Sequence, residues 1–346
     1  ALISLLALLF LAGLTPVRAT SVRSDNLDLG ANKSLPAYVW TDPSVKPRAV
    51  ALCIHGLTLH GGVYEKLAGE LAPKGFVVMA PDLQGYGRWQ NKPVEYDRSF
   101  DSLVALAAAA RAKYDNLPLY VIGESLGADL AMRLASQKPD LVDGLVLSSP
   151  AIKRRYFLGP ILNETTAFLS NPKRQVNLRP YIRRFFSEDP LVTQDTLDDP
   201  LVRKRLTAWD LLRTCNAIRP ALKYADNLSP EIAVLVIQGS QDRMLRTSAV
   251  SSLLQHIKST NQTVRWFNDR GHLLLETAHL RNDTAAVVRD WFDDQLAAGK
   301  QRVAVKDGDH STITTIHTAM YNQPAAISAL THPANLSAQL NSEFSN

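Results

Sequence analysis

Cysteine and the spacings that bind metals are scarce in this sequence of 346 residues. It has two cysteines, Cys53 within an apolar run and Cys215 in a stretch of helical periodicity, and neither belongs to a CxxC or Cys/His pattern. A disulfide framework or a zinc site would need such patterns. We therefore expect two small buried thiols, no disulfide, and no metal or organic cofactor.

Charge of one sign is not in large excess either. Lysine and arginine number 38 against 33 aspartate and glutamate residues, which gives a net charge of +5. This mild basicity is far below the charge density of a dedicated nucleic-acid binder, so we expect no nucleic-acid partner. Hydrophobic residues make up 46% of the chain, enough to bury the core of one large or two ordinary domains.

Long hydrophobic runs are confined to the N-terminus. The run there covers about 14 residues, whereas a membrane-spanning helix needs about 20. It is followed by Val17-Arg18-Ala19, a small-x-small pattern that suits signal-peptidase cleavage. We predict a signal peptide over residues 1–19 and an exported protein, periplasmic or secreted. An uncleaved segment that anchors the protein to a membrane is the alternative.

From about residue 36, short apolar runs alternate with longer stretches of helical periodicity. This alternation is typical of a mostly parallel sheet with crossover helices, so the predicted fold class is α/β. The core is predicted over 36–150 and 228–299. Strands are predicted over 48–54, 76–80, 119–122, 145–148, 233–238 and 263–267, and helices over 62–71, 99–113, 126–136, 248–257 and 277–296.

The strand rhythm stops over residues 151–227, which we predict to be an inserted helical cap. From 150 to 227 there are 14 basic against 8 acidic residues, so this segment carries more net positive charge than the whole chain. Its apolar residues either line an amphipathic cap over an active site or form the core of a small helical subdomain. They are Tyr156, Phe157, Ile161, Phe168, Phe185, Phe186 and Trp209. The polar tail over 300–346 is predicted to be disordered.

A nucleophile is predicted at Ser125. The segment Gly123-Glu124-Ser125-Leu126-Gly127 fits G-x-S-x-G and lies between the strand-like LYVI and the helix-like LGADLAMRLAS. A serine at such a turn adopts strained backbone angles, and the flanking glycines let strand and helix approach closely. The helix that follows also directs its N-terminal N–H groups toward developing negative charge.

A serine hydroxyl is a weak nucleophile and needs a base and an acid that orients the base. In the order Ser, acid, His, the acid Asp242 follows the strand-like IAVLVIQ and the base His272 follows TVRWFN. Asp269 is a rival for the acid, although it lies on the same loop as the base. We expect surface or capping roles for the other candidate bases, which are His256, His279, His310, His317 and His332.

The tetrahedral intermediate of acyl transfer needs two N–H donors. We assign one to the backbone of Leu126, the residue after the nucleophile. The other is assigned to Leu57, in the loop after the strand-like AVALCI. His55 in the same loop either shapes the backbone of this oxyanion hole or takes part in catalysis, and we favour the structural role.

Several short segments together resemble the monoglyceride lipase and lysophospholipase branch of the α/β-hydrolases, over roughly 37–296. They are HG at 55–56, HGG at 60–62, Tyr64, PDLQGYG at 81–87, GESLG at 123–127, GSQD at 239–242 and GH at 271–272. In that branch the catalytic triad matches Ser125, Asp242 and His272. The usual Gly-His-Gly-x-Ser is replaced here by GYGRW at 85–89, which bears on acyl-chain and head-group preference.

The resemblance implies hydrolysis of a carboxylic ester through an acyl-enzyme, with a small-molecule and preferably lipid ester as substrate. The basic cap suits contact with a membrane surface, or it is simply a solvated face. A peptidase or a short-chain or feruloyl-type esterase on the same fold is the enzymatic alternative. A catalytically silent member that binds lipid is the alternative from another class.

Overall fold

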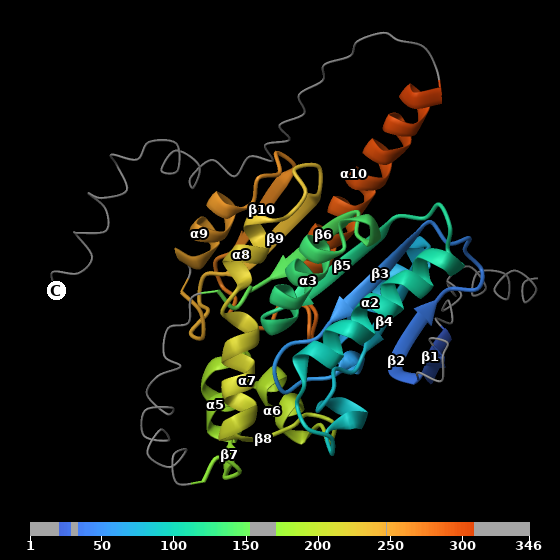
Figure 1. Cartoon of the computed structure of the whole chain (residues 1–346). Coiled ribbons are helices and arrows are strands. Elements are labelled where there is room, and N and C mark those ends of the chain that lie inside the picture. Colours follow the sequence, from blue (N-terminus) through green and yellow to red (C-terminus); the bar gives the residue numbers. More distant parts are fainter. Residues whose placement is uncertain (1–20, 29–33, 153–170, 247, 308–346) are drawn as a thin grey trace, which may run out of the picture. The chain divides into compact units, whose positions relative to one another are not determined.

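The structure is a computed structural model that describes residues 21–28, 34–152, 171–246 and 248–307 (Figure 1). The chain divides into two compact units, Ala1–Ala297 and Ala298–Asn346. All the elements that position the candidate site belong to the first unit. Within the described residues, no helix is both long enough and apolar enough to cross a membrane.

Eight strands form one sheet in the order β1-β2-β4-β3-β5-β6-β9-β10. β2 pairs antiparallel with β1 and with β4, whereas the pairs from β4 to β10 are parallel. The strands are β1 Ser21–Asp28, β2 Ser34–Thr41, β3 Ala49–Ile54, β4 Phe76–Pro81, β5 Leu119–Glu124, β6 Gly144–Ser148, β9 Ala233–Gly239 and β10 Gln262–Phe267. The predicted mostly parallel α/β sheet is therefore confirmed.

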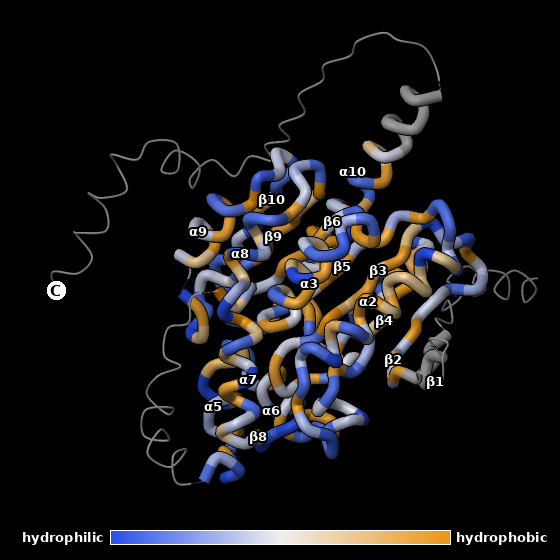
Figure 2. Tube along the Cα trace, viewed as in Figure 1, coloured by the Kyte–Doolittle hydropathy of each residue, from blue (hydrophilic) through white to orange (hydrophobic). Residues whose placement is uncertain are grey.

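Helices cover both faces of the sheet, because its central strands are apolar on both sides. Leu52 of β3 packs in a cluster that includes α2 and α3, whereas its neighbours Ala51 and Cys53 pack in a cluster that includes α1 and Trp291 of α10. Figure 2 shows the hydrophobic residues gathered along these strands. The helices are α1 Glu65–Leu71, α2 Tyr96–Lys113, α3 Leu126–Gln137, α9 Ser248–His256 and α10 Asn282–Asp307.

Between β6 and β9 the chain leaves the sheet and forms a set of short elements that we call the insertion. Figure 1 shows most of them grouped at one end of the strands, whereas the last helix, which leads back to β9, lies beside the sheet. They are β7 Gln175–Asn177 and β8 Arg205–Thr207, which pair antiparallel, and helices α5 Arg179–Phe185, α6 Pro190–Asp198, α7 Ala208–Ile218 and α8 Ala221–Asp226.

The apolar residues that the sequence analysis named in the insertion differ in how far they are buried. Phe186 is buried and Phe185 is half-buried, whereas Trp209 is 45% exposed. Both cysteines are free, and Cys215 is half-buried instead of buried as we expected. Four of the apolar residues lie outside the described residues: Tyr156, Phe157, Ile161 and Phe168.

Two boundaries differ most from those that the sequence predicts. The sheet begins at Ser21, ahead of the predicted core, because β1 is a polar edge strand whose sequence SVRSDNLD has no apolar run. The last helix begins at Asn282 instead of residue 277 and continues to Asp307, so residues 300–307 of the predicted tail are helical. The rest of that tail, like the predicted signal peptide over 1–19, lies outside the described residues.

Candidate active site

Ser125 occupies a strained turn between β5 and α3. Its φ of 55° and ψ of −121° are unusual for a residue that is not glycine. A serine just before a helix usually accepts a hydrogen bond from the first turn, yet the Ser125 side chain makes no such capping bond. The hydroxyl is therefore not used to cap α3. Thr58 and Ser149, which follow β3 and β6, also have positive φ, so backbone strain gathers at this edge of the sheet.

The glycines on either side of Ser125 are required by close packing. A Cβ atom on Gly123 would lie 2.3 Å from the carbonyl oxygen of Gly127, and one on Gly127 would lie 1.9 Å from that of Ile54. Both distances are far below van der Waals contact with rigid backbone. The strand and the helix can thus meet at Ser125 only with glycine at both positions.

His272 and Asp242 are brought together from two loops. The Nδ1–H of His272 donates to Oδ2 of Asp242 over 2.8 Å, and both side chains are buried. Asp242 also accepts hydrogen bonds from the backbone N–H groups of Met244 and Leu245, at 2.7 and 2.9 Å, and from Nε2 of Gln238. These donors hold the carboxylate, which in turn sets the tautomer of the imidazole so that Nε2 carries the lone pair.

The protonation of this pair suits a base and its orienting acid. Burial would lower the pKa of His272, but the negative charge and hydrogen bond of Asp242 outweigh it, and Glu124 adds to the rise, so the pKa lies above its ordinary value. Burial would likewise raise the pKa of Asp242, but His272 and the backbone donors lower it. The lowered pKa favours the ionised form of Asp242 beside the imidazole of His272.

The rival residues have other partners. Asp269 is exposed and forms ion pairs with Arg270 and Arg281. His279 bonds to Asp195 over 2.8 Å, and His256 bonds to Asp226 over 2.8 Å. The remaining histidines that we weighed lie outside the described residues: His310, His317 and His332.

Leu126 and Leu57, the two residues assigned as oxyanion donors, belong to segments that meet at Ser125. Leu126 is the first residue of α3, where backbone N–H groups have no partner within the helix. Leu57 follows Gly56, at which an added Cβ would lie 3.5 Å from the Cβ of Ser125 and 2.9 Å from Oε2 of Glu276. The loop after β3 is thus packed directly against the turn that carries Ser125.

The ring of His55 holds this loop through two hydrogen bonds. It is fully buried, its Nδ1 bonds to the carbonyl of Gly56 over 2.8 Å, and its Nε2 accepts the N–H of Leu83 over 3.0 Å. These two partners require Nδ1 to carry the proton. Burial lowers the pKa of His55 to about 4, so the ring is neutral. This geometry fits the structural role that we favoured.

Glu124 is a site residue that sequence reasoning missed. Its buried carboxylate accepts the backbone N–H groups of Leu274, Leu275 and Glu276 at 2.8 to 3.3 Å, and the hydroxyl of Ser148. It therefore ties the residue before Ser125 to the segment just after His272. Burial raises the pKa of Glu124, and hydrogen bonds from Ser148 and the loop oppose that rise.

Glu276 is the second missed residue. Its Oε1 accepts the N–H of Gly56 over 2.7 Å. Burial, and then the negative charge of Glu124, raise the pKa of Glu276 well above its ordinary value. Glu124 is surrounded by hydrogen-bond donors that oppose the rise in its pKa, whereas Glu276 has fewer of them. The signal available in the sequence was a carboxyl residue ending the apolar run HLLLE at 272–276.

The insertion takes part in placing His272. The carboxylate of Glu188 accepts the N–H of Gly271, and the carbonyl of Phe186 accepts the N–H of Leu273 over 3.0 Å. From the sheet side, the hydroxyl of Ser149 donates to the carbonyl of His272 over 2.9 Å. The base is thus held on both flanks by the segment between α5 and α6.

The loop at 85–89, whose sequence GYGRW differs from the usual pattern of the monoglyceride lipase branch, is held by a series of hydrogen-bonded hydroxyl groups. Tyr86 bonds to Tyr96 of α2 over 2.7 Å, and Tyr96 bonds to Thr214 of α7 over 2.8 Å. The ring of Tyr86 also meets His55 edge-on, with 5.7 Å between the ring centres. The tyrosine at this position therefore links the loop after β4 to the insertion.

No group of three or more potential metal ligands occurs among the residues that the structure describes. What the described side chains assemble is a buried histidine with a carboxylate partner, a strained serine and a glycine-containing loop beside it. This arrangement can support nucleophilic acyl transfer.

Comparison with known proteins gives relatives along most of the chain. A monoacylglycerol lipase from Mycolicibacterium smegmatis is 26% identical over 249 residues, which is 69% of this chain and 86% of the relative. A mouse monoglyceride lipase is 22% identical over 276 residues, covering 74% of this chain and 86% of the relative.

Solved structures and a family model agree on the fold. A soluble variant of monoglyceride lipase from Saccharomyces cerevisiae, solved with a substrate analogue, superposes with a TM-score of 0.67 at 15% identity and covers 80% of this chain and 94% of that one. The family model described as serine aminopeptidase, S33, matches residues 45–277. That match spans more than half of the sequence, and with this α/β-hydrolase fold the chain belongs to the serine aminopeptidase S33 family.

Proposed function

We propose that this protein is a serine hydrolase that cleaves carboxylic esters of lipids, such as monoacylglycerols or lysophospholipids, through an acyl-enzyme. The observation that carries the proposal is the pairing of His272 with Asp242 over 2.8 Å at the edge of the sheet where Ser125 has a strained backbone. The names of the two lipase relatives support the choice of a lipid ester.

In the proposed reaction, Ser125 attacks the ester carbonyl while Nε2 of His272 takes the hydroxyl proton. Asp242 stabilises the resulting imidazolium, and the N–H groups of Leu57 and Leu126 bind the oxyanion. His272 then returns the proton to the leaving alcohol. Water, activated by the same histidine, attacks the acyl-enzyme and releases the acid.

The test is hydrolysis of p-nitrophenyl esters from acetate to palmitate, with monoacylglycerols in parallel, by the protein and by Ser125→Ala. We expect activity that falls at least about a thousandfold in the variant. A fluorophosphonate should label wild type and not the variant. If it does so while no ester is hydrolysed, the nucleophile is right and the choice of substrate is wrong. Absence of both labelling and hydrolysis would favour the catalytically silent lipid binder.

A peptidase is the second candidate, because the matching family is described as a serine aminopeptidase. An enzyme that recognises a free amino terminus needs negative charge facing the substrate. The insertion carries, next to the loop that follows Leu57, a hollow lined by the cationic side chains of Arg179, Arg203, Lys204 and Arg205, and no acidic residue lines it. Aminoacyl p-nitroanilides, assayed beside the esters, distinguish the two: faster turnover of the anilides would reverse our preference.

We also propose that the insertion contacts membrane surfaces. Trp209 and Leu212 lie three residues apart on α7, hence on one side of it, and are 45% and 38% exposed. Leu191 of α6 is 61% exposed. Exposed apolar side chains on a basic segment suit anionic lipid surfaces. Trp209→Ser with Leu212→Ser should weaken sedimentation with phosphatidylglycerol vesicles, whereas Trp266→Ser, at an exposed tryptophan of β10, should not.

Export from the cytosol is proposed from the apolar run and the Val17-Arg18-Ala19 sequence alone. N-terminal sequencing of the protein made in its own cell would test it. A mature chain beginning near residue 20 would support cleavage, and an intact apolar run would favour the membrane anchor.

A further inference from the structure

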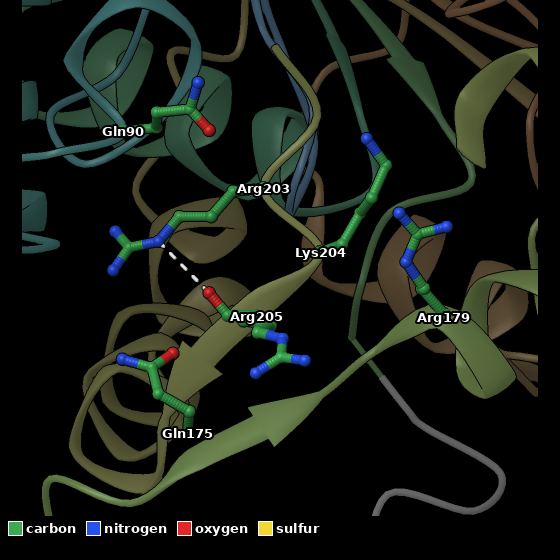
Figure 3. Close-up of a pocket in the computed structure, with 6 residues that line it drawn as sticks. All are labelled: Gln90, Gln175, Arg179, Arg203, Lys204 and Arg205. Atoms are coloured by element: carbon green, nitrogen blue, oxygen red, sulfur yellow. Dashed lines mark hydrogen bonds between the residues drawn. The ribbon is translucent and has the colours of Figure 1, made fainter. Parts of the chain in front are cut away.

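A basic hollow lies in the insertion, beside the loop that follows Leu57. It has a volume of about 430 Å³ and is lined by six residues, four of them cationic and none acidic: Gln90, Gln175, Arg179, Arg203, Lys204 and Arg205 (Figure 3). β7, the start of α5 and the segment that enters β8 supply five of the six. The backbone N–H of Arg203 donates to the carbonyl of Thr58 over 2.8 Å, which attaches the hollow to that loop.

The positive charge of the hollow is only partly neutralised. Arg203 pairs with Asp210 at 3.3 Å, and its other N–H groups donate to backbone carbonyls. Lys204 donates to the backbone carbonyl of Asp199. In the described part of the chain, the guanidinium groups of Arg179 and Arg205 make neither a hydrogen bond nor a salt bridge.

Two of the cationic side chains of the hollow repel each other. Figure 3 shows the side chains of Lys204 and Arg179 running in the same direction, one beside the other. Burial and then repulsion from Arg179 lower the pKa of Lys204, despite the nearby Asp199 and Asp198. Asp199 is itself engaged by His60 over 2.8 Å. A bound anion would relieve the repulsion that these acids leave in place.

We propose that this hollow binds a phosphate group. The three guanidinium groups and one ammonium that line the hollow are charged donors, and guanidinium matches phosphate oxygens in pairs. The amides of Gln90 and Gln175 add neutral donors at the rim. The phosphate is carried either by the head group of a lysophospholipid or by a free phosphate, and binding does not depend on ester hydrolysis.

The test measures binding to the full chain carrying Ser125→Ala, so that turnover cannot interfere. The probes are inorganic phosphate, glycerol 3-phosphate and glycerol, titrated by calorimetry at fixed ionic strength. Arg179→Gln with Arg205→Gln removes the two guanidinium groups of the hollow for which the described residues supply no hydrogen-bond or salt-bridge partner. Arg183→Gln with Arg184→Gln is the matched control, because it removes the same charge from exposed positions of α5 that do not line the hollow.

We expect phosphate and glycerol 3-phosphate to bind with dissociation constants below about 1 mM, and glycerol not to bind. Affinity should fall at least about tenfold in the hollow variant and little in the control. Tighter binding of glycerol 3-phosphate than of phosphate identifies a head-group site, and equal binding identifies a free-phosphate site. No binding by either probe, or equal losses in both variants, would overturn the proposal.

A second arm keeps this proposal separate from the proposed function. With Ser125 intact, Arg179→Gln with Arg205→Gln should reduce kcat/KM for lysophosphatidic acid and not for the matching monoacylglycerol if the site holds a head group; equal rates would indicate a free phosphate. If neither lipid is hydrolysed, the ester-hydrolase proposal fails, while the binding measurements still decide the phosphate site.

Discussion

The carboxylate of Glu124 accepts the backbone N–H of Leu274 over 2.8 Å and so joins the residue before the nucleophile to the loop of the base. Two further N–H groups of that loop point to the same carboxylate. The negative charge of Glu124 also contributes to the raised pKa of His272. Glu124 is therefore a positioning residue that also favours the imidazolium form.

Glu124→Gln should lower kcat and shift the pH dependence of activity. The neutral side chain turns an NH₂ group toward N–H donors, and losing a charged hydrogen bond costs about 1.5–3 kcal/mol, or about ten- to a hundredfold in rate. Without the charge, the pKa of His272 falls, so the acidic limb of the kcat/KM profile should move to lower pH. If the acidic limb of the kcat/KM profile stays at the same pH in Glu124→Gln, this role of Glu124 is contradicted.

Glu276→Gln is the control for that profile, since the charged groups that raise the pKa of His272 are Asp242 and Glu124. It also tests whether Glu276 is protonated. A carboxyl whose pKa is raised by folding binds more protons in the native state, so wild-type stability should fall as pH rises above about 4.5, by at most about 1.4 kcal/mol per pH unit. Urea unfolding at several pH values should show that the free energy of unfolding of Glu276→Gln rises relative to that of wild type as pH increases over this range.

Glu276→Ala should behave differently, because it leaves the buried N–H of Gly56 without its acceptor. The expected cost is about 1–3 kcal/mol of unfolding free energy, together with a lower kcat, since the loop carrying Leu57 loses its anchor. Unfolding free energies and kcat equal to those of Glu276→Gln would show that the bond from Gly56 is unimportant.

Asp242→Asn should reduce kcat by about ten thousandfold, because an amide no longer stabilises the imidazolium and favours the wrong tautomer of His272. Asp269→Asn removes the rival acid and should leave kcat within about twofold of wild type, since its partners are Arg270 and Arg281. Steady-state assays on both variants compare the two candidates directly. Similar losses in both would reopen the assignment.

Two glycine substitutions should act in opposite directions on stability. Gly127→Ala places a Cβ 1.9 Å from a backbone carbonyl and should cost about 1–3 kcal/mol or more. Gly69→Ala, within α1 and with nothing inside 4 Å, should add about 0.5–1 kcal/mol. Thermal unfolding of both variants checks the sign of each change, and a neutral Gly127→Ala would contradict the packing described at the nucleophile.

Glu188→Ala should lower kcat by about tenfold while leaving the fold intact, because the exposed Glu188 supports the N–H of Gly271 and little else. Glu188→Gln keeps an acceptor oxygen and should retain most activity. Circular dichroism and kcat for the pair distinguish a loss of positioning from a loss of structure. Equal activity in all three proteins would separate the insertion from the placement of the base.

The sequence pattern predicts the central strands well because a strand buried on both faces must be apolar along its length, as in AVLVIQ at 233–238. β1 escapes prediction because it pairs on one side only, and its polar sequence resembles a loop. The residue types and chain order also predict Ser125, Asp242 and His272, and the structure joins the latter two by a hydrogen bond. Their catalytic roles, like the oxyanion donors, stay predictions.

Glu124 and Glu276 could not be assigned from the sequence for a physical reason. Glu124 accepts the backbone N–H of Leu274, which is 150 residues away in the chain, and Glu276 accepts that of Gly56, which is 220 residues away. Almost any residue type can supply such a backbone donor. The local sequence around each glutamate therefore does not indicate which backbone group it binds. Only the packed structure shows that two carboxyl groups share the space behind the nucleophile.

The bonds that hold the loop of His272 from the insertion have a consequence for how the protein folds. The contact between Gly271 and Glu188 closes a stretch of 83 residues, and the bond to Glu124 closes one of 150. Contacts so distant along the chain form late, because loop closure must precede any gain from them. On refolding, the base should reach its place only after the sheet and the insertion have docked, so catalytic competence marks the final step of assembly.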